Sequence, residues 1–131
     1  MEAILLHVTP IYAGLLALLF ILLSARVIGR RIGAGVSLGD GGDARLMRRI
    51  RVQGNFAEYA PFGVLLLAVA ELAGAAPLWL HLCGLLLLAG RIGHAIGLGA
   101  EPQIMILRRA GMVATFTALG ALGLTCLGLA L

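Results

Sequence analysis

Four long apolar stretches follow one another along the chain, separated by short polar or glycine-rich segments. The first, from residue 4 to residue 25, contains no charged residue and is followed by Arg26. A transmembrane helix needs about 20 consecutive apolar residues to cross the hydrocarbon core. We therefore predict a first membrane helix over residues 4–26. No basic residue precedes it, so it is not expected to be a cleavable signal peptide.

Two turn signals divide the remaining apolar sequence into three further helices. Between Tyr59 and Gly90 only Glu71 is charged, which makes the run too long for one span. Residues 74–77 (Gly-Ala-Ala-Pro) have the composition of a turn, and residues 99–102 mark a second break. These boundaries predict helices over residues 45–74, 77–98 and 108–131. The fold class that follows is an all-α membrane protein with a bundle of four transmembrane helices.

The composition agrees with this assignment and limits the classes of molecule that the protein is expected to bind. The 131 residues, expected to form a single domain over 1–131, are 61% hydrophobic and 12% charged, and all ten basic residues are arginine. These arginines flank apolar spans and are not interleaved with aromatic residues, so membrane lipids or an anionic small ligand are expected rather than nucleic acid. Cys83 and Cys126 lie far apart without CxxC spacing, so no disulfide and no metal site is expected.

The distribution of the arginines predicts the orientation of the bundle. They cluster in the segment after the first helix and around the break after the third, whereas the turn at residues 74–77 has none. The positive-inside rule then places the arginine side in the cytoplasm and both termini in the periplasm.

Small residues recur at helical spacing in the third and fourth helices, and such faces let membrane helices approach closely. These residues are Gly90, Gly93 and Gly97, followed by Gly111, Thr115, Gly120 and Gly123.

Polar residues at the start of the second helix are the strongest functional signal. Arg51, Asn55, Glu58 and Tyr59 fall at i, i+4, i+7 and i+8 and so share one helical face. Polar groups at membrane depth are functional candidates by default. A carboxylate there stays ionised only when it is paired, and Arg51 or Arg91 could be the partner of Glu58. A purely structural arginine–glutamate clamp is the alternative.

Other polar residues offer further candidates. Arg91 and His94 share a face of the third helix that should meet this polar face; His94 could transfer a proton or serve as a hydrogen-bonded packing group. Arg108 and Arg109 open the fourth helix, where a fixed charge could stabilise an anion such as a thiolate, or could simply set topology. Glu71, near the outer end of the second helix, is expected to be structural and to reach headgroup water.

These residues resemble a known family. The string RVQGNFAEYAP is similar to the R-x-Q-x-N-x-x-E-Y-x-P pattern of membrane-associated proteins in eicosanoid and glutathione metabolism (MAPEG), which include microsomal glutathione S-transferase. The likeness extends to Arg26, Arg91 and the arginine that opens the fourth helix, and Arg91-x-x-His94 resembles the bacterial branch. The resemblance implies a homotrimer in the bacterial inner membrane, with sites between neighbouring subunits on the cytoplasmic side.

The resemblance also implies an activity. It points to a glutathione-dependent transferase or peroxidase, in which glutathione is the co-substrate and a hydrophobic electrophile or lipid hydroperoxide is attacked. Glu58 would receive the amino group of glutathione, and Arg51 and Arg26 its carboxylates. Arg108 or Arg109 would activate the thiol. The remaining glutathione-binding residues implied are Gln53, Asn55, Tyr59 and His94, with Arg91 added by the neighbouring subunit.

One departure from the family pattern keeps a second function open. Eicosanoid-synthesising members carry tyrosines on the third helix where this chain has His94 and Leu98, which argues against a specialised eicosanoid enzyme. The alternative is a non-catalytic membrane scaffold trimer that binds lipid or a thiol. A small drug exporter is disfavoured, because the first helix has no membrane-embedded carboxylate.

Overall fold

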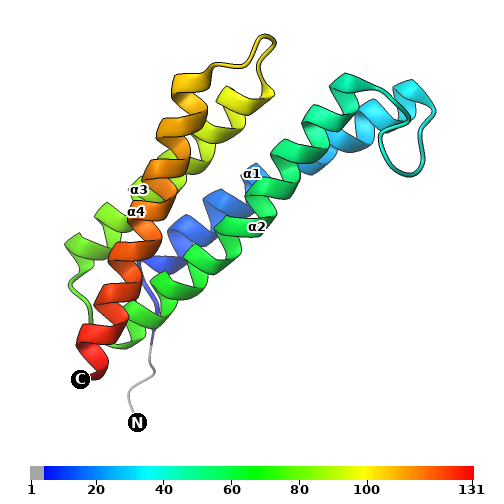
Figure 1. The fold of residues 1–131 in the computed structure, drawn as a ribbon. Helices are drawn as coiled ribbons and strands as arrows, with labels where there is room; N and C mark the ends of the chain where they lie inside the picture. Colours follow the sequence, from blue (N-terminus) through cyan, green and yellow to red (C-terminus); the bar gives the residue numbers. More distant parts are fainter. Residues whose placement is uncertain (1–4) are drawn as a thin grey trace.

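The computed structural model describes residues 5–131 and consists of four α-helices (Figure 1). They are α1 (Thr9–Ala34), α2 (Ala44–Leu72), α3 (Pro77–Gly99) and α4 (Met105–Ala130). All four are long and apolar enough to cross a membrane, and the described residues contain no strand. The predicted all-α membrane fold with four spans is therefore confirmed.

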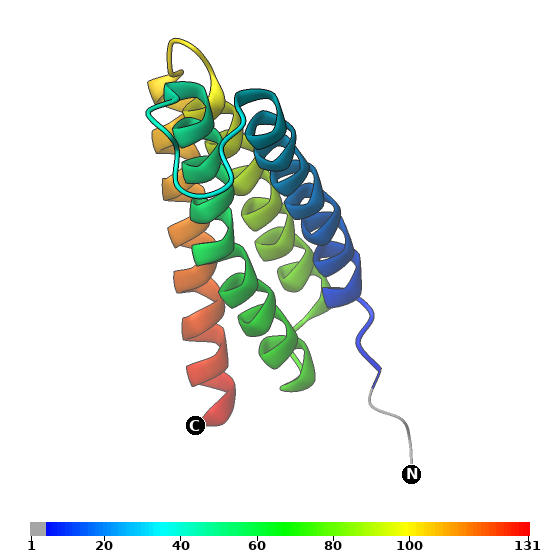
Figure 2. The same cartoon turned by 90° about the vertical axis from the view of Figure 1, so that its right-hand side faces the viewer.

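The helices run alternately up and down, so the connections fall at opposite ends of the bundle. The α1–α2 loop (residues 35–43) and the α3–α4 loop (residues 100–104) lie at one end, which we call the loop end (Figures 1 and 2). The start of α1, the α2–α3 turn and the end of α4 lie at the other. Both arginine-rich segments therefore occupy the same end of the molecule.

The helix boundaries differ from the prediction mainly in α1. The predicted start at residue 4 lies outside the described residues, and the helix begins at Thr9. It continues to Ala34 rather than ending at residue 26, because arginine is a good helix former and its charged head can reach water beyond the apolar span. Gly35, in the left-handed conformation with φ 67°, ends the helix. The second helix ends at Leu72 instead of residue 74, and the fourth begins at Met105 instead of residue 108.

Glu71 ties the far end of α2 to the start of α1. Its carboxylate accepts hydrogen bonds from the backbone N–H groups of His7, Val8 and Thr9 at 2.6, 2.7 and 2.7 Å. The first amides of a helix have no partner within the helix. Glu71 is therefore structural, as predicted, but it binds the first turn of α1 rather than headgroup water.

Asp43 closes the α1–α2 connection at the loop end. Its carboxylate caps α2 by accepting from the backbone N–H of Leu46 at 2.7 Å, and it forms an ion pair with Arg30. The hydrogen bond from Arg30 is the main cause that lowers the pKa of Asp43 below its usual value, and the bond from Leu46 adds to it.

Glycines bring α3 and α4 into backbone contact near the loop end. A Cβ added to Gly97 would lie 2.8 Å from the Cα atom of Arg108, and one added to Gly111 would lie 2.8 Å from that of His94. The side chain of Thr115, next along this face of α4, is fully buried. The predicted close packing is confirmed for these residues.

The later glycines of α4 take no part in this close approach within the single chain. Gly120 and Gly123 have nothing within 4 Å of an added Cβ, so this position faces open space at both residues. The two helices nevertheless stay in contact toward the far end, where Trp79 Nε1 donates to Thr125 Oγ1 at 2.9 Å.

Candidate functional site

The polar face of α2 forms a row along the helix, and its last member, Tyr59, contacts Phe116 of α4. Within this row, Arg51 Nη2 lies 3.6 Å from Glu58 Oε1, and the two side chains are 56% and 51% exposed. The expected arginine partner of Glu58 is therefore Arg51. We call Arg51, Asn55, Glu58 and Tyr59 the polar stripe.

Arg91 of α3 lies behind the polar stripe and contacts two of its members. Its Nη1 donates to Asn55 Oδ1 at 2.8 Å and to the Asn55 carbonyl oxygen at 3.2 Å. Its guanidinium carbon lies 5.6 Å from the centre of the Tyr59 ring, a cation–π distance. With only 1% of its surface exposed, Arg91 is enclosed by its own chain. The third helix thus meets the stripe as predicted, and within the single chain the guanidinium is engaged by Asn55.

The fourth helix completes this cluster with two residues that were not predicted to belong to the site. The Sδ atom of Met112 lies 3.5 Å from Arg91 Nη2, and the Phe116 ring packs edge-on against Tyr59 with the ring centres 5.5 Å apart. In the sequence, only their i, i+4 spacing indicates that the two side chains share a face. In an apolar helix this spacing does not distinguish a functional site from a surface that contacts lipid.

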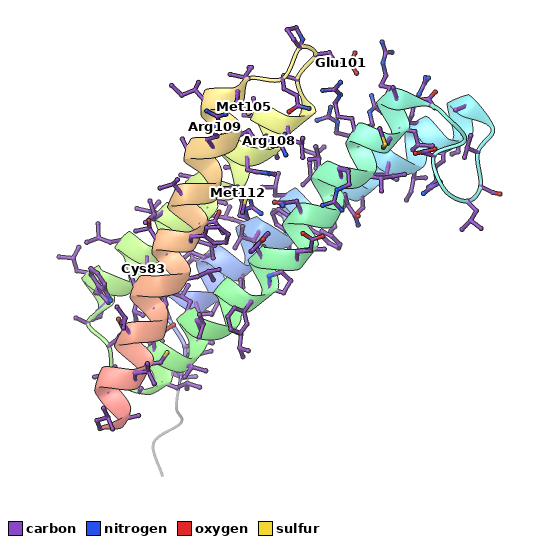
Figure 3. All side chains as sticks on the ribbon, in the orientation of Figure 1. Cys83, Glu101, Met105, Arg108, Arg109 and Met112 are labelled. Carbon is purple, nitrogen blue, oxygen red and sulfur yellow. The ribbon has the colours of Figure 1, made fainter. Side chains whose placement is uncertain are left out.

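The two candidate activating arginines stand at the loop end of α4, beyond Met112 (Figure 3). Arg108 is partly buried, and its Nη1 donates to Gln103 Oε1 at 2.8 Å, whereas Arg109 is exposed. Both lie within one helical turn of Met112 in sequence, so either could extend toward the stripe. His94 is 3% exposed and is held inside the α3–α4 contact.

Arg26 and Gln53 lie away from the polar stripe in the single chain. The Nε2 atom of Gln53 is 3.5 Å from Ser24 Oγ, which places this side chain against α1. The carbonyl oxygen of Arg26 accepts from Arg49 Nη1 at 2.9 Å. The structure therefore does not bring these two predicted glutathione ligands together with Arg51 inside one chain.

An apolar groove of about 310 Å³ runs between α1 and α2 on another side of α2. Its α2 wall includes Ala57 and Pro61, which flank Glu58 along the helix. The full lining is Ala13, Leu16, Ala17, Phe20, Phe56, Ala57, Ala60, Pro61 and Val64.

Comparisons with known proteins place the chain in a family. The model of the MAPEG family matches residues 9–128. The chain is 40% identical over 112 residues to the inner membrane protein YecN of Escherichia coli K12, covering 86% of this chain and 84% of that protein. The protein of the same name from E. coli O6:H1 matches equally well. No solved structure gives a significant match. Together with the four-helix fold and the polar stripe, these matches show that the chain belongs to the MAPEG family.

Proposed function

We propose that this protein is a glutathione-dependent enzyme of the inner membrane, a transferase or peroxidase that attacks hydrophobic electrophiles or lipid hydroperoxides. The observation that carries the proposal is the convergence of the polar stripe with the buried Arg91 in a member of the MAPEG family. The inner-membrane location rests on the four spans and on the name of the E. coli relative.

The Arg51–Glu58 pair is chemically suited to one end of glutathione. That end is an amino acid zwitterion, with an ammonium group beside a carboxylate. Glu58 would accept hydrogen bonds from the ammonium group while Arg51 donates two to the carboxylate. Both side chains are half exposed and only 3.6 Å apart. A zwitterion could therefore replace their mutual contact with two charge-assisted ones.

Buried Arg91 would act by positioning rather than by direct contact. It fixes Asn55 through two hydrogen bonds and lies against the ring of Tyr59. Asn55 and Tyr59 would then present the carboxamide and the phenol to the tripeptide in one orientation.

Thiol activation would fall to Arg108 or Arg109. A positive charge near the sulfur favours the thiolate, which is the nucleophilic form. With an aryl halide, the sulfur forms a bond to carbon and the halide leaves with the electron pair of the broken bond. With a hydroperoxide, the thiolate takes the terminal oxygen, the released alkoxide takes up a proton, and the glutathione sulfenic acid reacts with a second glutathione to give the disulfide and water.

In a homotrimer, one side of α2 in one subunit would face the other side of α2 in the neighbouring subunit. The polar stripe and the apolar groove lie on different sides of this helix, so neither encloses a substrate alone. In a ring with rotational symmetry, one surface of each subunit meets a different surface of the next. The groove of one copy would then bring a hydrophobic acceptor to the stripe of its neighbour, and Arg26 and Gln53 would join the site from that copy.

The decisive experiment follows thiolate formation and turnover in purified protein. Glutathione added to the detergent-solubilised protein should produce the ultraviolet absorbance of a thiolate, and an aryl halide should be conjugated. The variant Arg108→Gln/Arg109→Gln should bind glutathione without producing that absorbance. If the unmodified protein shows neither thiolate nor conjugation, the enzyme proposal fails.

One observation favours the scaffold as a second candidate. His94 and Leu98 occupy the positions of family tyrosines, and both are more than 90% buried in the chain. They therefore cannot present a polar group to the thiol. Glutathione binding without any turnover would support this scaffold, which holds lipid or thiol and carries no chemistry.

A further inference from the structure

A second polar cavity lies at the loop end, separate from the polar stripe. It has a volume of about 250 Å³. It lies between α1, the first turns of α2 and the α3–α4 connection. Its lining residues are Arg26, Arg45, Arg48, Arg49, Gly99 and Glu101.

Most of the positive charge in this cavity is uncompensated. Arg48 Nη1 donates to the Ala100 carbonyl oxygen at 2.9 Å, which ties α2 to the α3–α4 loop. Its Nε atom is buried and lies 3.3 Å from Glu101 Oε1, yet the geometry does not make a hydrogen bond. Glu101 is the one carboxylate in the lining, against four guanidinium groups.

The other arginines keep donors that are free to bind a ligand. Arg49 uses one nitrogen to donate to the Arg26 carbonyl oxygen at 2.9 Å. The side chains of Arg26 and Arg45 make no hydrogen bond or ion pair to any residue in the described part of the chain. Like charges one helical turn apart, such as Arg45 and Arg49, destabilise a helix unless an anion lies between them.

The surroundings of the cavity indicate where its ligand comes from. A smaller recess shares Arg26, Arg49 and Gly99 with it and adds the buried side chains of Leu23 and Val52. The guanidinium groups thus stand over an apolar floor at the end of the membrane spans. This is the depth at which phosphate groups of lipids meet hydrocarbon.

We propose that this cavity binds a phosphate-bearing anion. Guanidinium groups match phosphate oxygens through paired N–H donors. The anion could be the headgroup of an anionic phospholipid or a soluble phosphate compound. Arg26 also belongs to the proposed thiol site, but Arg45, Arg48 and Arg49 have no part in it, so the phosphate proposal can be tested through them independently of glutathione chemistry.

Two binding measurements separate the two sources. Native mass spectrometry of the detergent-solubilised protein compares added phosphatidylglycerol with phosphatidylcholine. Thermal unfolding compares inorganic phosphate with chloride at equal ionic strength. The test variant is Arg45→Gln/Arg49→Gln, and Arg108→Gln/Arg109→Gln is the control, because it removes the same number of charges from the same end outside the cavity. The single variant Arg45→Gln, at an exposed residue, serves if the double variant fails to fold.

A lipid site would be established if the protein prefers phosphatidylglycerol and this preference falls about tenfold in the test variant but not in the control. One charge-assisted hydrogen bond accounts for about that factor. Stabilisation by inorganic phosphate with the same variant dependence, without a lipid preference, would establish a soluble ligand. The proposal is overturned if neither probe binds in preference to its comparison, or if the control weakens binding as much as the test variant does.

Discussion

Arg51 and Glu58 lie about two helical turns apart on α2, near enough to pair and exposed enough to exchange that pairing for a ligand. Exposed ion pairs contribute about 0–1 kcal/mol to stability. Buried Arg91 differs, because its loss would leave Asn55 Oδ1 without its donor inside the protein. Ligand binding and fold stability therefore rest on different arginines of the same cluster.

Arg51→Ala should separate these two roles. We expect glutathione affinity to fall by tenfold or more, because one charge-assisted contact is lost, while the melting temperature stays nearly unchanged. Arg91→Ala should instead lower the melting temperature, since it removes a buried hydrogen-bonded charge. Calorimetric titration with glutathione and thermal unfolding in detergent measure the two effects. A structural arginine–glutamate clamp would give the opposite result for Arg51→Ala, namely lost stability with intact binding.

Asp43 makes the stability of the loop end depend on pH. Its pKa is lowered in the folded protein, mainly by the hydrogen bond from Arg30. A lowered pKa means that the stabilisation is fully present above the ordinary value of about 4 and is lost as pH falls below it. Hydrogen exchange at the α2 N-terminus should therefore be constant from neutral pH to about 5 and accelerate, relative to the intrinsic exchange rate, in stronger acid.

Asp43→Asn is the matched control for this prediction. Asparagine still caps a helix by accepting from the backbone N–H of Leu46, but it cannot ionise and does not form an ion pair with Arg30. The acid-dependent acceleration should disappear in this variant. If it persisted unchanged, another group would be responsible.

Among the helices, α3 and α4 depend most on the absence of side chains at their contact. Gly97→Ala would place a carbon within 2.8 Å of a backbone carbon of α4, which no side-chain rotation can relieve. We expect it to lower the melting temperature strongly and to move the start of α4. Gly93→Ala is the control, because its added carbon would meet its nearest neighbour at 3.8 Å, an ordinary contact. Equal melting temperatures for the two variants would contradict the backbone contact between these helices.

At the opposite end of the bundle, Glu71 holds α1 in place. Glu71→Ala leaves three backbone N–H groups without their carboxylate, and we expect a loss of about 2 kcal/mol in unfolding free energy, as for hydrogen bonds to charged groups. Glu71→Gln keeps an acceptor oxygen and should lose less. Thermal unfolding of both variants measures the difference. A Glu71→Ala protein as stable as the wild type would show that water satisfies these amides equally well.

The pattern of apolar residues was sufficient to predict the helices but not how they face one another. Lipid-crossing length and turn composition identify all four spans, and helical spacing puts Arg51, Asn55, Glu58 and Tyr59 on one face. The rotation of each helix about its axis is set by contacts between distant residues. For this reason the enclosure of Arg91 and the turn of Gln53 toward α1 were not predictable. Apolar Met112 left no polar signal at all.

For the molecule as a whole, the concentration of arginine at the loop end predicts how it lies in the membrane. We expect this end in the cytoplasm and both termini in the periplasm. Alkaline phosphatase, which is active only in the periplasm, should be active when fused after Leu131 and inactive when inserted in the α1–α2 loop. The reverse pattern of activity would place the candidate site on the periplasmic side.

The Glu71 carboxylate, which accepts hydrogen bonds from the first turn of α1, also determines when this turn can form during synthesis of the chain. Glu71 is 62 to 64 positions later in the chain than the three amides that it binds. When α1 leaves the ribosome and enters the bilayer, its acceptor has not yet emerged from the ribosome. The start of the first helix can therefore reach its final state only after the second helix has been made and has crossed. Maturation of the N-terminal end thus waits for the first hairpin to insert.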